Sequence, residues 1–261
     1  MKRLILATLL AVGAAGAAQA DDALKAAIAG EHRASNAARD QYRHPYETLS
    51  FFGIKPNMTV VELAPSGGWY TEILAPYLRD KGKLIGAGEA IEPGKRYGTA
   101  FRKKLDSNPA LYGKVVPSIF EPPTRYDIAP ANSVDMVLTF RNLHNWVGAG
   151  DEAVKTTFKE IHKVLKPGGV LGVVDHRLPA AMPQDAKASS GYVHESYVIK
   201  MAENAGFKLA ARSEVNANPK DQANHEKGVW TLPPVLANKD KDREKYMAIG
   251  ESDRMTLKFV K

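Results

Sequence analysis

The stretch Thr59-Val-Val-Glu-Leu-Ala-Pro-Ser-Gly-Gly-Trp-Tyr-Thr-Glu-Ile-Leu74 decides the fold of this chain. Its β-branched start predicts a strand, Pro65 to Gly68 predicts a turn, and the apolar spacing from Trp69 to Leu78 predicts a helix. A strand, a glycine turn and a helix in this order form the first half of a βαβ unit. Such a turn places backbone N–H groups and a helix N-terminus at the carboxyl edge of a sheet, where a polar ligand can bind. Glu62, at the strand end, can accept hydrogen bonds from that ligand.

Apolar runs bounded by turn residues predict six further strands, with helices between most of them. Short runs of this kind are typical of parallel strands that are buried on both faces. The alternation predicts an α/β fold with a Rossmann-like, doubly wound, mostly parallel seven-stranded sheet and an antiparallel last strand. We expect the last two strands to form an antiparallel edge, because only a polar segment separates them and it shows no regular helix. The strands are expected at 84–88, 114–117, 133–140, 170–174, 207–215 and 255–260, and the helices at 93–105, 151–165 and 192–204.

The first 20 residues carry the features of a secretory signal peptide. The charged pair Lys2-Arg3 precedes an apolar run rich in Leu and Ala, and Ala18-Gln19-Ala20 is a small-x-small cleavage site. The sequence therefore predicts a cleaved signal peptide at residues 1–20 and a periplasmic or secreted mature protein without a membrane span.

We expect residues 21–56 to form an N-terminal helical cap on a Rossmann-like domain of residues 57–261. The Ala-rich segment 22–43 predicts one helix, and His44-Pro45 breaks it because proline disfavours a helical conformation in the residue before it. A second short helix is predicted at 46–52. The cap either crosses the edge of the sheet or packs on its flank.

Composition excludes several kinds of site. The chain has 261 residues, 44% of them hydrophobic, and a formal net charge of +7 at pH 7. It has no Lys/Arg block interleaved with aromatic residues, so we expect no nucleic-acid partner. The absence of cysteine excludes disulfides, thiolate metal sites and a cysteine nucleophile. Four histidines lack the close spacing of metal ligands, so no metal site is predicted; they are His44, His144, His176 and His194.

Five motifs carry a resemblance to known proteins. They are Arg39-Asp-Gln-Tyr-Arg-His-Pro45, Gly67-Gly-Trp-Tyr-Thr-Glu-Ile-Leu-Ala-Pro76, Phe140-Arg-Asn-Leu-His-Asn-Trp146, Lys166-Pro-Gly-Gly-Val-Leu171 and Ser252-Asp-Arg-Met-Thr-Leu257. The fourth resembles the segment before the fifth strand of class I S-adenosylmethionine-dependent methyltransferases. More narrowly, nearly all of the mature chain resembles a family of exported bacterial predicted methyltransferases. The resemblance implies a methyltransferase fold, S-adenosylmethionine as cofactor and a small-molecule acceptor.

The superfamily's glycine turn is altered in this chain. Its pattern is an acid followed after one residue by Gly-x-Gly-x-Gly, and the resemblance aligns Glu62 with the acid and Ala64, Ser66 and Gly68 with the three glycines. Two of the three glycines are therefore replaced. The resemblance implies that these residues and Gly67 seat the methionine end of the cofactor. Ser66 either weakens that binding or donates its hydroxyl to the methionine carboxylate.

The resemblance also assigns roles to the ends of later strands. It implies that Glu89 accepts hydrogen bonds from the ribose hydroxyls, that Phe120 flanks the adenine, and that Arg141 and Asn142 line the methyl-donor end. Polar and aromatic side chains that leave the carboxyl edge together indicate a site. His144 is a candidate general base, because its intrinsic pKa lies near neutrality; the alternative is that it only forms a hydrogen bond. Tyr42 to His44 either closes the pocket as a lid or is ordinary helix packing.

These observations support one functional hypothesis and two rivals. The first is S-adenosylmethionine-dependent methyl transfer to a small acceptor outside the cytoplasm, in which the protein aligns donor and acceptor. Because S-adenosylmethionine is made in the cytosol, the alternative is a non-catalytic periplasmic protein that binds another metabolite on a methyltransferase fold. A hydrolase or lyase that acts on a nucleoside-like ligand is a third reading.

Overall fold

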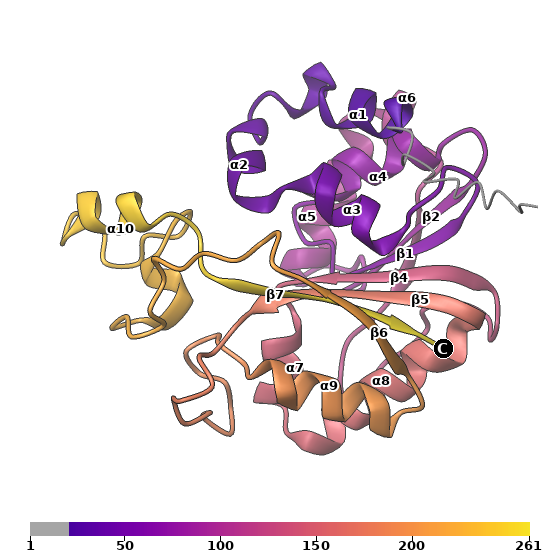
Figure 1. Cartoon of the computed structure of the whole chain (residues 1–261). Coiled ribbons are helices and arrows are strands. Elements are labelled where there is room, and N and C mark those ends of the chain that lie inside the picture. The colour runs from indigo at the N-terminus through magenta and orange to yellow at the C-terminus, as the bar shows by residue number, and fades with distance from the viewer. Residues whose placement is uncertain (1–20) are drawn as a thin grey trace, which may run out of the picture.

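A computed structural model describes residues 21–261, which build a seven-stranded sheet with helices on both faces (Figure 1). The strand order is β3-β2-β1-β4-β5-β7-β6. Six strands run in one direction, and β7 runs antiparallel to both of its neighbours. The strands are β1 (Thr59–Leu63), β2 (Lys83–Gly88), β3 (Val116–Ile119), β4 (Val134–Phe140), β5 (Leu165–His176), β6 (Lys208–Ser213) and β7 (Arg254–Val260).

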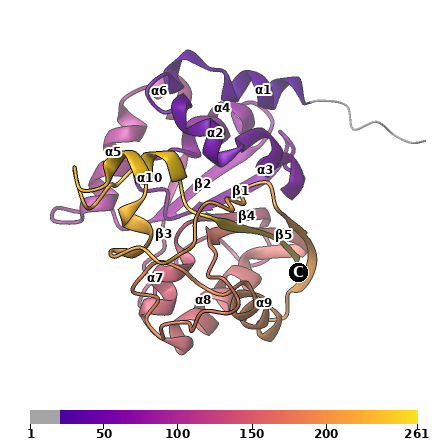
Figure 2. The ribbon, with the colours of Figure 1, turned by 60° about the vertical axis from the view of Figure 1, so that its left-hand side comes forward.

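Helices cover the sheet on two sides, with α1, α3, α4 and α5 on one face and α7, α8 and α9 on the other (Figure 1). Figure 2 shows the same arrangement from another side. The helices are α1 (Asp22–Ile28), α2 (Asp40–Arg43), α3 (Pro45–Phe52), α4 (Thr71–Leu78), α5 (Arg96–Asp106), α6 (Pro109–Tyr112), α7 (Leu143–Gly148), α8 (Asp151–Val164), α9 (Glu195–Asn204) and α10 (Arg243–Ile249).

Side chains that alternate between the two faces of the sheet form two apolar cores, one on each face. Val60 of β1 packs in the core that contains α4, whereas Val61 and Leu63 pack in the core that contains α8. Successive side chains of a strand point to opposite faces, so a β-branched run fills both cores at once. This is why the parallel strands read as continuous apolar runs rather than as alternating ones.

The predicted strands and main helices are confirmed, and so is the antiparallel edge formed by the last two strands. β6 and β7 pair antiparallel at one side of the sheet, with β7 next to β5 and β6 outermost. The connection from Ser213 to Arg254 is long enough to cross back over the sheet, and it contains the 3₁₀ turn Gly228–Thr231 and α10. The prediction that this segment contains no regular helix was therefore wrong.

The N-terminal segment is not the single helix that was predicted for 22–43. It divides into α1, the 3₁₀ turns Glu31–Arg33 and Ala37–Arg39, and α2. Contacts of Arg33 account for the end of α1 at Ile28. Its guanidinium donates to the carbonyl of Ile28 at 2.6 Å and pairs with Asp40 at 2.7 Å, so the chain turns back around this side chain. Tertiary contacts of a fully buried arginine thus override the helical preference of an Ala-rich segment.

The second helix of the cap is confirmed as α3. Pro45 occupies its first turn, and Gly53 ends it with a left-handed φ of 82°. Phe52 of this helix packs on the backbone of β5, because a β-carbon at Gly172 would lie 2.8 Å from its ring. The cap therefore packs on the flank of the sheet, and residues 37–43 bring Arg39 and Arg43 to the cavity at its carboxyl edge.

Within residues 21–261, no helix has the length and apolar character to cross a membrane. The predicted signal peptide at residues 1–20 lies outside the described residues.

Candidate functional site

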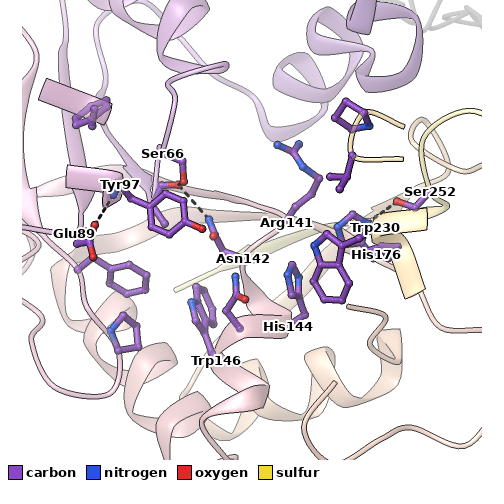
Figure 3. A pocket seen from close by; sticks show the side chains of 18 of the residues that line it. Ser66, Glu89, Tyr97, Arg141, Asn142, His144, Trp146, His176, Trp230 and Ser252 are labelled. Atoms are coloured by element: carbon purple, nitrogen blue, oxygen red, sulfur yellow. Dashed lines mark hydrogen bonds between the residues drawn. The ribbon is translucent and has the colours of Figure 1, made fainter. Parts of the chain in front are cut away.

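A cavity of about 900 Å³ opens at the carboxyl edge of the sheet, where the strand order reverses between β1 and β4. Ligands bind at such switch points in open α/β sheets, and this volume falls in the range of small-molecule sites. The residues after β1, β2, β3 and β4 line it, together with the cap and the segment between β6 and β7. Figure 3 shows Ser66, Glu89 and Tyr97 at one end, His144, His176, Trp230 and Ser252 at the other, and Arg141 and Asn142 between them.

The turn after β1 keeps the backbone path of a glycine turn. Ala64 and Ser66, at the positions of the first two glycines, have φ values of 47° and 50°, and Gly68 has a φ of 75°. Left-handed conformations cost residues with a β-carbon about 1–2 kcal/mol each, so the surrounding structure imposes them here. Of the residues predicted to bind the cofactor at this turn, Ala64 and Ser66 line the cavity, whereas Gly67 and Gly68 are not among its lining residues.

Glu62 lies beneath the turn rather than in the cavity wall. Its Oε2 accepts a hydrogen bond of 2.6 Å from the hydroxyl of Thr71, the first residue of α4. Burial raises the pKa of Glu62 to about 7, although the hydrogen bond from Thr71 opposes this shift. The carboxyl group therefore joins β1 to α4, and any effect on a ligand would pass through the turn.

Glu89 and Phe120 line the end of the cavity near the turn. One carboxylate oxygen of Glu89 accepts from the backbone N–H groups of Tyr97 and Gly98, at 2.6 and 3.0 Å, and so holds the start of α5 against β2 (Figure 3). The ring of Phe120 meets that of Trp146 edge to face at 5.6 Å. This end therefore offers a carboxylate beside an aromatic surface.

The tip of β4 supplies Arg141 and Asn142. The side-chain amide of Asn142 donates to the carbonyl of Leu63 at 3.2 Å and so ties the tip of β4 to the end of β1. Arg141 has a left-handed φ of 58° and lines the cavity. Its guanidinium makes no hydrogen bond or ion pair with any residue of the described chain, 21–261.

His144 is paired with a carboxylate that the sequence analysis did not identify. Both its backbone N–H and its Nδ1 contact the carboxylate of Asp175, at 2.9 and 3.1 Å. Burial by itself would raise the pKa of Asp175, but His144 and His176 outweigh burial and lower that pKa below its ordinary value. The ionised carboxylate can only accept, so Nδ1 carries the proton and Nε2 is left as a base.

His176 lies beside this pair. Its Nδ1 is 2.5 Å from the hydroxyl of Ser252, and its ring centroid is 5.3 Å from that of His144 (Figure 3). Burial lowers the pKa of His176 well below its ordinary value, which keeps the ring neutral. Ligand atoms of His144, Asp175 and His176 lie within 4.8 Å of one another, a grouping that the sequence spacing did not indicate. Both Nδ1 atoms already have partners within the protein.

Comparisons with known proteins agree with this geometry. A family model described as a methyltransferase domain matches residues 100–173. A solved S-adenosylmethionine-dependent methyltransferase from Aquifex aeolicus is 17% identical, with 88% of this chain and 95% of that chain covered and a TM-score of 0.57. Phosphoethanolamine N-methyltransferase 2 from Haemonchus contortus, solved with S-adenosylmethionine, is 13% identical over 84% of this chain and 52% of that chain, with a TM-score of 0.55.

The chain has the fold of class I S-adenosylmethionine-dependent methyltransferases. The cyclase SpnF shares this methyltransferase fold, at 16% identity over 84% of this chain and 80% of that chain, with a TM-score of 0.56. No curated protein matches the chain.

In this methyltransferase fold, sequence reasoning missed the residues that only tertiary structure brings to the cavity. Asp175 could have been found, because it ends the fifth strand and therefore lies beside the tip of the fourth. Trp230 had no such signal; its ring meets that of His144 edge to face at 6.2 Å, from the long segment before β7. Of the predicted lid, Arg43 lines the cavity, whereas Tyr42 and His44 are not among the lining residues.

Proposed function

We propose that the protein binds S-adenosylmethionine at the glycine-turn end of the cavity and transfers its methyl group to a small acceptor at the His144 end. One observation carries the proposal: the cavity that begins at the turn after β1 also contains an imidazole whose Nδ1 is held by a buried carboxylate. A methyltransferase fold alone would be compatible with a binding protein or with the chemistry of a cyclase.

The residues at the turn fit this cofactor. The left-handed backbone at Ala64 and Ser66 leaves the turn open to the cavity, and the Ser66 hydroxyl can donate to a carboxylate. Glu89, with Oε2 committed to α5, has a second oxygen to accept from ribose hydroxyls. Phe120 offers an apolar surface for a base. When bound, S-adenosylmethionine supplies an electrophilic methyl group.

His144 and Asp175 would handle the acceptor's proton. Nε2 of His144 would take the proton of the acceptor oxygen or nitrogen, whose new bond to the methyl carbon would replace the methyl–sulfonium bond of the cofactor. The carboxylate of Asp175 orients the ring and stabilises the imidazolium, a role in which positioned bases contribute about 10²- to 10⁴-fold to the rate. Trp230, whose ring meets that of His144 edge to face at 6.2 Å, would limit the access of water to it.

Calorimetric titration of the mature protein tests the cofactor half of this proposal. We expect S-adenosylmethionine and S-adenosylhomocysteine to bind with micromolar affinity. No heat at millimolar ligand would favour the alternative, a non-catalytic metabolite-binding protein. The replacement of two of the superfamily's glycines by Ala64 and Ser66 is the observation that favours this alternative.

Methyl transfer from labelled cofactor into a panel of small phenols, amines and hydroxy acids tests the catalytic half. We expect His144→Ala to lower turnover by about 10²-fold or more while the affinity for S-adenosylhomocysteine stays within about twofold. His162→Ala, on α8, is the matched control, since His162 does not line the cavity. Equal turnover in His144→Ala and the control would remove His144 from the mechanism.

Export remains part of the proposal and rests on the signal-like sequence of residues 1–20. Fusion of this segment to a phosphatase that is active only after export provides the test. Phosphatase activity in intact cells is expected, and its loss is expected when Lys2 and Arg3 are replaced by glutamate. An inactive fusion would place the protein in the cytoplasm.

A further inference from the structure

Arginines from three distant motifs meet around one carboxylate at the edge of the cavity. Glu251 accepts from Arg39 Nε at 2.6 Å, Arg43 Nε at 3.4 Å and Arg254 Nη1 at 3.1 Å. Arg141 belongs to the same group, because its charge acts on Arg43 and it lines the same cavity. We name Arg39, Arg43, Arg141 and Arg254 the arginine cluster.

The arginine cluster carries more positive charge than its surroundings neutralise. Within the described chain, Glu251 is the acid that pairs with Arg39, Arg43 and Arg254. Burial and the neighbouring guanidinium groups lower the pKa of Arg43 and of Arg141 below the ordinary arginine value. Four guanidinium groups and one carboxylate leave a net positive charge beside the cavity, and such charge is costly where the groups are buried.

Two members of the arginine cluster have donors without partners. Arg43 is 1% exposed and stacks on the ring of Trp69 at 4.4 Å, and its Nη1 has no hydrogen-bond partner among the described residues. The guanidinium of Arg141 likewise has no partner there, and both residues line the cavity. A buried donor left unpaired costs about 1–3 kcal/mol, and more when it is charged, so Nη1 of Arg43 is expected to be met by a ligand, and the half-buried guanidinium of Arg141 can bind the same ligand.

These donors lie at the His144 end of the cavity. Glu251, which holds three of the arginines, directly precedes Ser252, whose hydroxyl contacts His176. Arg141 lies between Asn142 and the group formed by His176 and Trp230 (Figure 3). A ligand anchored here would have its reactive group near His144 rather than at the glycine turn.

We propose that Arg43 and Arg141 form an oxyanion subsite that holds a carboxylate or phosphate group of the acceptor. As an assignment of substrate class, this rests on the proposed function. Guanidinium groups bind such anions through paired hydrogen bonds of fixed geometry, which gives both affinity and orientation. The acceptor is then a small anion with its reactive oxygen or nitrogen a few bonds from its charged group, so that the two ends reach the arginines and His144 together.

Titration with matched probes tests the subsite. Benzoate and phenyl phosphate carry the two oxyanions, and benzamide is a neutral analogue of benzoate. Against the protein saturated with S-adenosylhomocysteine, we expect at least one of the anions to bind about tenfold or more tightly than benzamide, as for charged hydrogen bonds. Preference for benzoate or for phenyl phosphate distinguishes carboxylate from phosphate acceptors. Equal binding of all three probes would overturn the proposal.

Arg141→Gln is the informative variant, because the side chain it shortens has no partner whose loss would unfold the protein. We expect it to reduce binding of the anionic probe to the level of benzamide, whereas Arg102→Gln, on the exposed side of α5, leaves binding unchanged. Thermal unfolding of each variant checks its folding. Unchanged anion binding in a folded Arg141→Gln would overturn the proposal.

The methionine carboxylate of the cofactor is the competing occupant. If Arg141→Gln weakened binding of S-adenosylhomocysteine but not of 5′-methylthioadenosine, which lacks that carboxylate, the arginines would belong to the cofactor and the acceptor subsite would be refuted. The two proposals can fail separately. Anion binding that depends on Arg141 without any binding of S-adenosylhomocysteine would refute the methyltransferase function while keeping the oxyanion subsite.

Discussion

Replacing Glu251 with glutamine would remove the negative charge at the centre of the arginine cluster while keeping nearly the same shape. Glu251 is 4% exposed and accepts from three guanidinium groups. A glutamine has one acceptor oxygen in place of two and presents an NH₂ group to buried cations. The variant therefore leaves four positive charges without a counter-charge.

The expected loss of stability is about 3 kcal/mol. Burial by itself would raise the pKa of Glu251, yet Arg254, Arg43 and Arg39 together lower it to about 2. At about 1.4 kcal/mol for each pH unit between this value and the ordinary 4.5, the ionised carboxylate contributes about 3 kcal/mol at neutral pH. Removing one partner of a buried ion pair costs a similar amount, about 3–5 kcal/mol. For a chain of this size, the unfolding midpoint should fall by about 10 °C.

The difference between the two proteins should depend on pH in one direction. The folded pKa of Glu251 lies below the unfolded one, so its contribution is complete above pH 4.5 and is lost as the pH falls toward 2. The wild type should therefore lose its advantage over Glu251→Gln between about pH 4.5 and pH 2, because its carboxyl group then becomes neutral as well.

Urea unfolding at pH 7, 5 and 3 measures this difference. The control is Glu226→Gln, which removes an acid whose pairing with Lys241 at 2.9 Å is exposed to solvent, and which should change the free energy of unfolding by less than about 1 kcal/mol. A Glu251→Gln protein within 1 kcal/mol of wild type at pH 7, or a deficit that stays constant down to pH 3, would refute the electrostatic account of the cluster.

Three further predictions concern the cavity. Asp175→Asn should lower turnover by about 10²-fold, because an amide fixes Nδ1 of His144 poorly and cannot stabilise the imidazolium; turnover equal to wild type in a methyl-transfer assay would contradict this. Ser66→Gly should raise the thermal midpoint by a degree or two, since it relieves about 1 kcal/mol of left-handed strain that the greater freedom of glycine when unfolded partly offsets. A lower midpoint would count against imposed strain at Ser66. EDTA should leave turnover unchanged, because both oxygens of Asp175 accept hydrogen bonds within the protein and only two histidines of the group remain as candidate ligands; activity lost to EDTA and restored by Zn²⁺ would reveal a metal site.

The sequence was sufficient where the deciding interactions are local. Val60 and Val61 form a strand because β-branched residues pack on both faces of a buried sheet, and Pro45 and Gly53 bound α3 because their backbone preferences match the two ends of a helix. The same reasoning failed at 22–43, where one buried arginine, Arg33, ends α1 through contacts that no helical pattern contains.

From the sequence, the site could be predicted only as the group of residues that follow the parallel strands. The residues after parallel strands meet at one edge of the sheet, so Ser66, Glu89, Phe120 and Arg141 could be assigned to one cavity from the order of elements. Which of them faces the cavity could not be assigned, because side-chain direction depends on the packing beneath. Glu62 illustrates this, since its carboxyl group turns to Thr71 below the turn.

By itself, the sequence determined the elements, their alternation and the edge at which a ligand would bind, since each follows from preferences within a few residues. Tertiary structure alone decided the chemistry of the acceptor end. His144 meets Asp175 across 31 positions, and Arg39 meets Glu251 across 212, so both contacts exist only after the strands have paired. Partners so far apart in the sequence produce no local pattern that could predict their contact, because the contact depends on how the folded chain surrounds each residue.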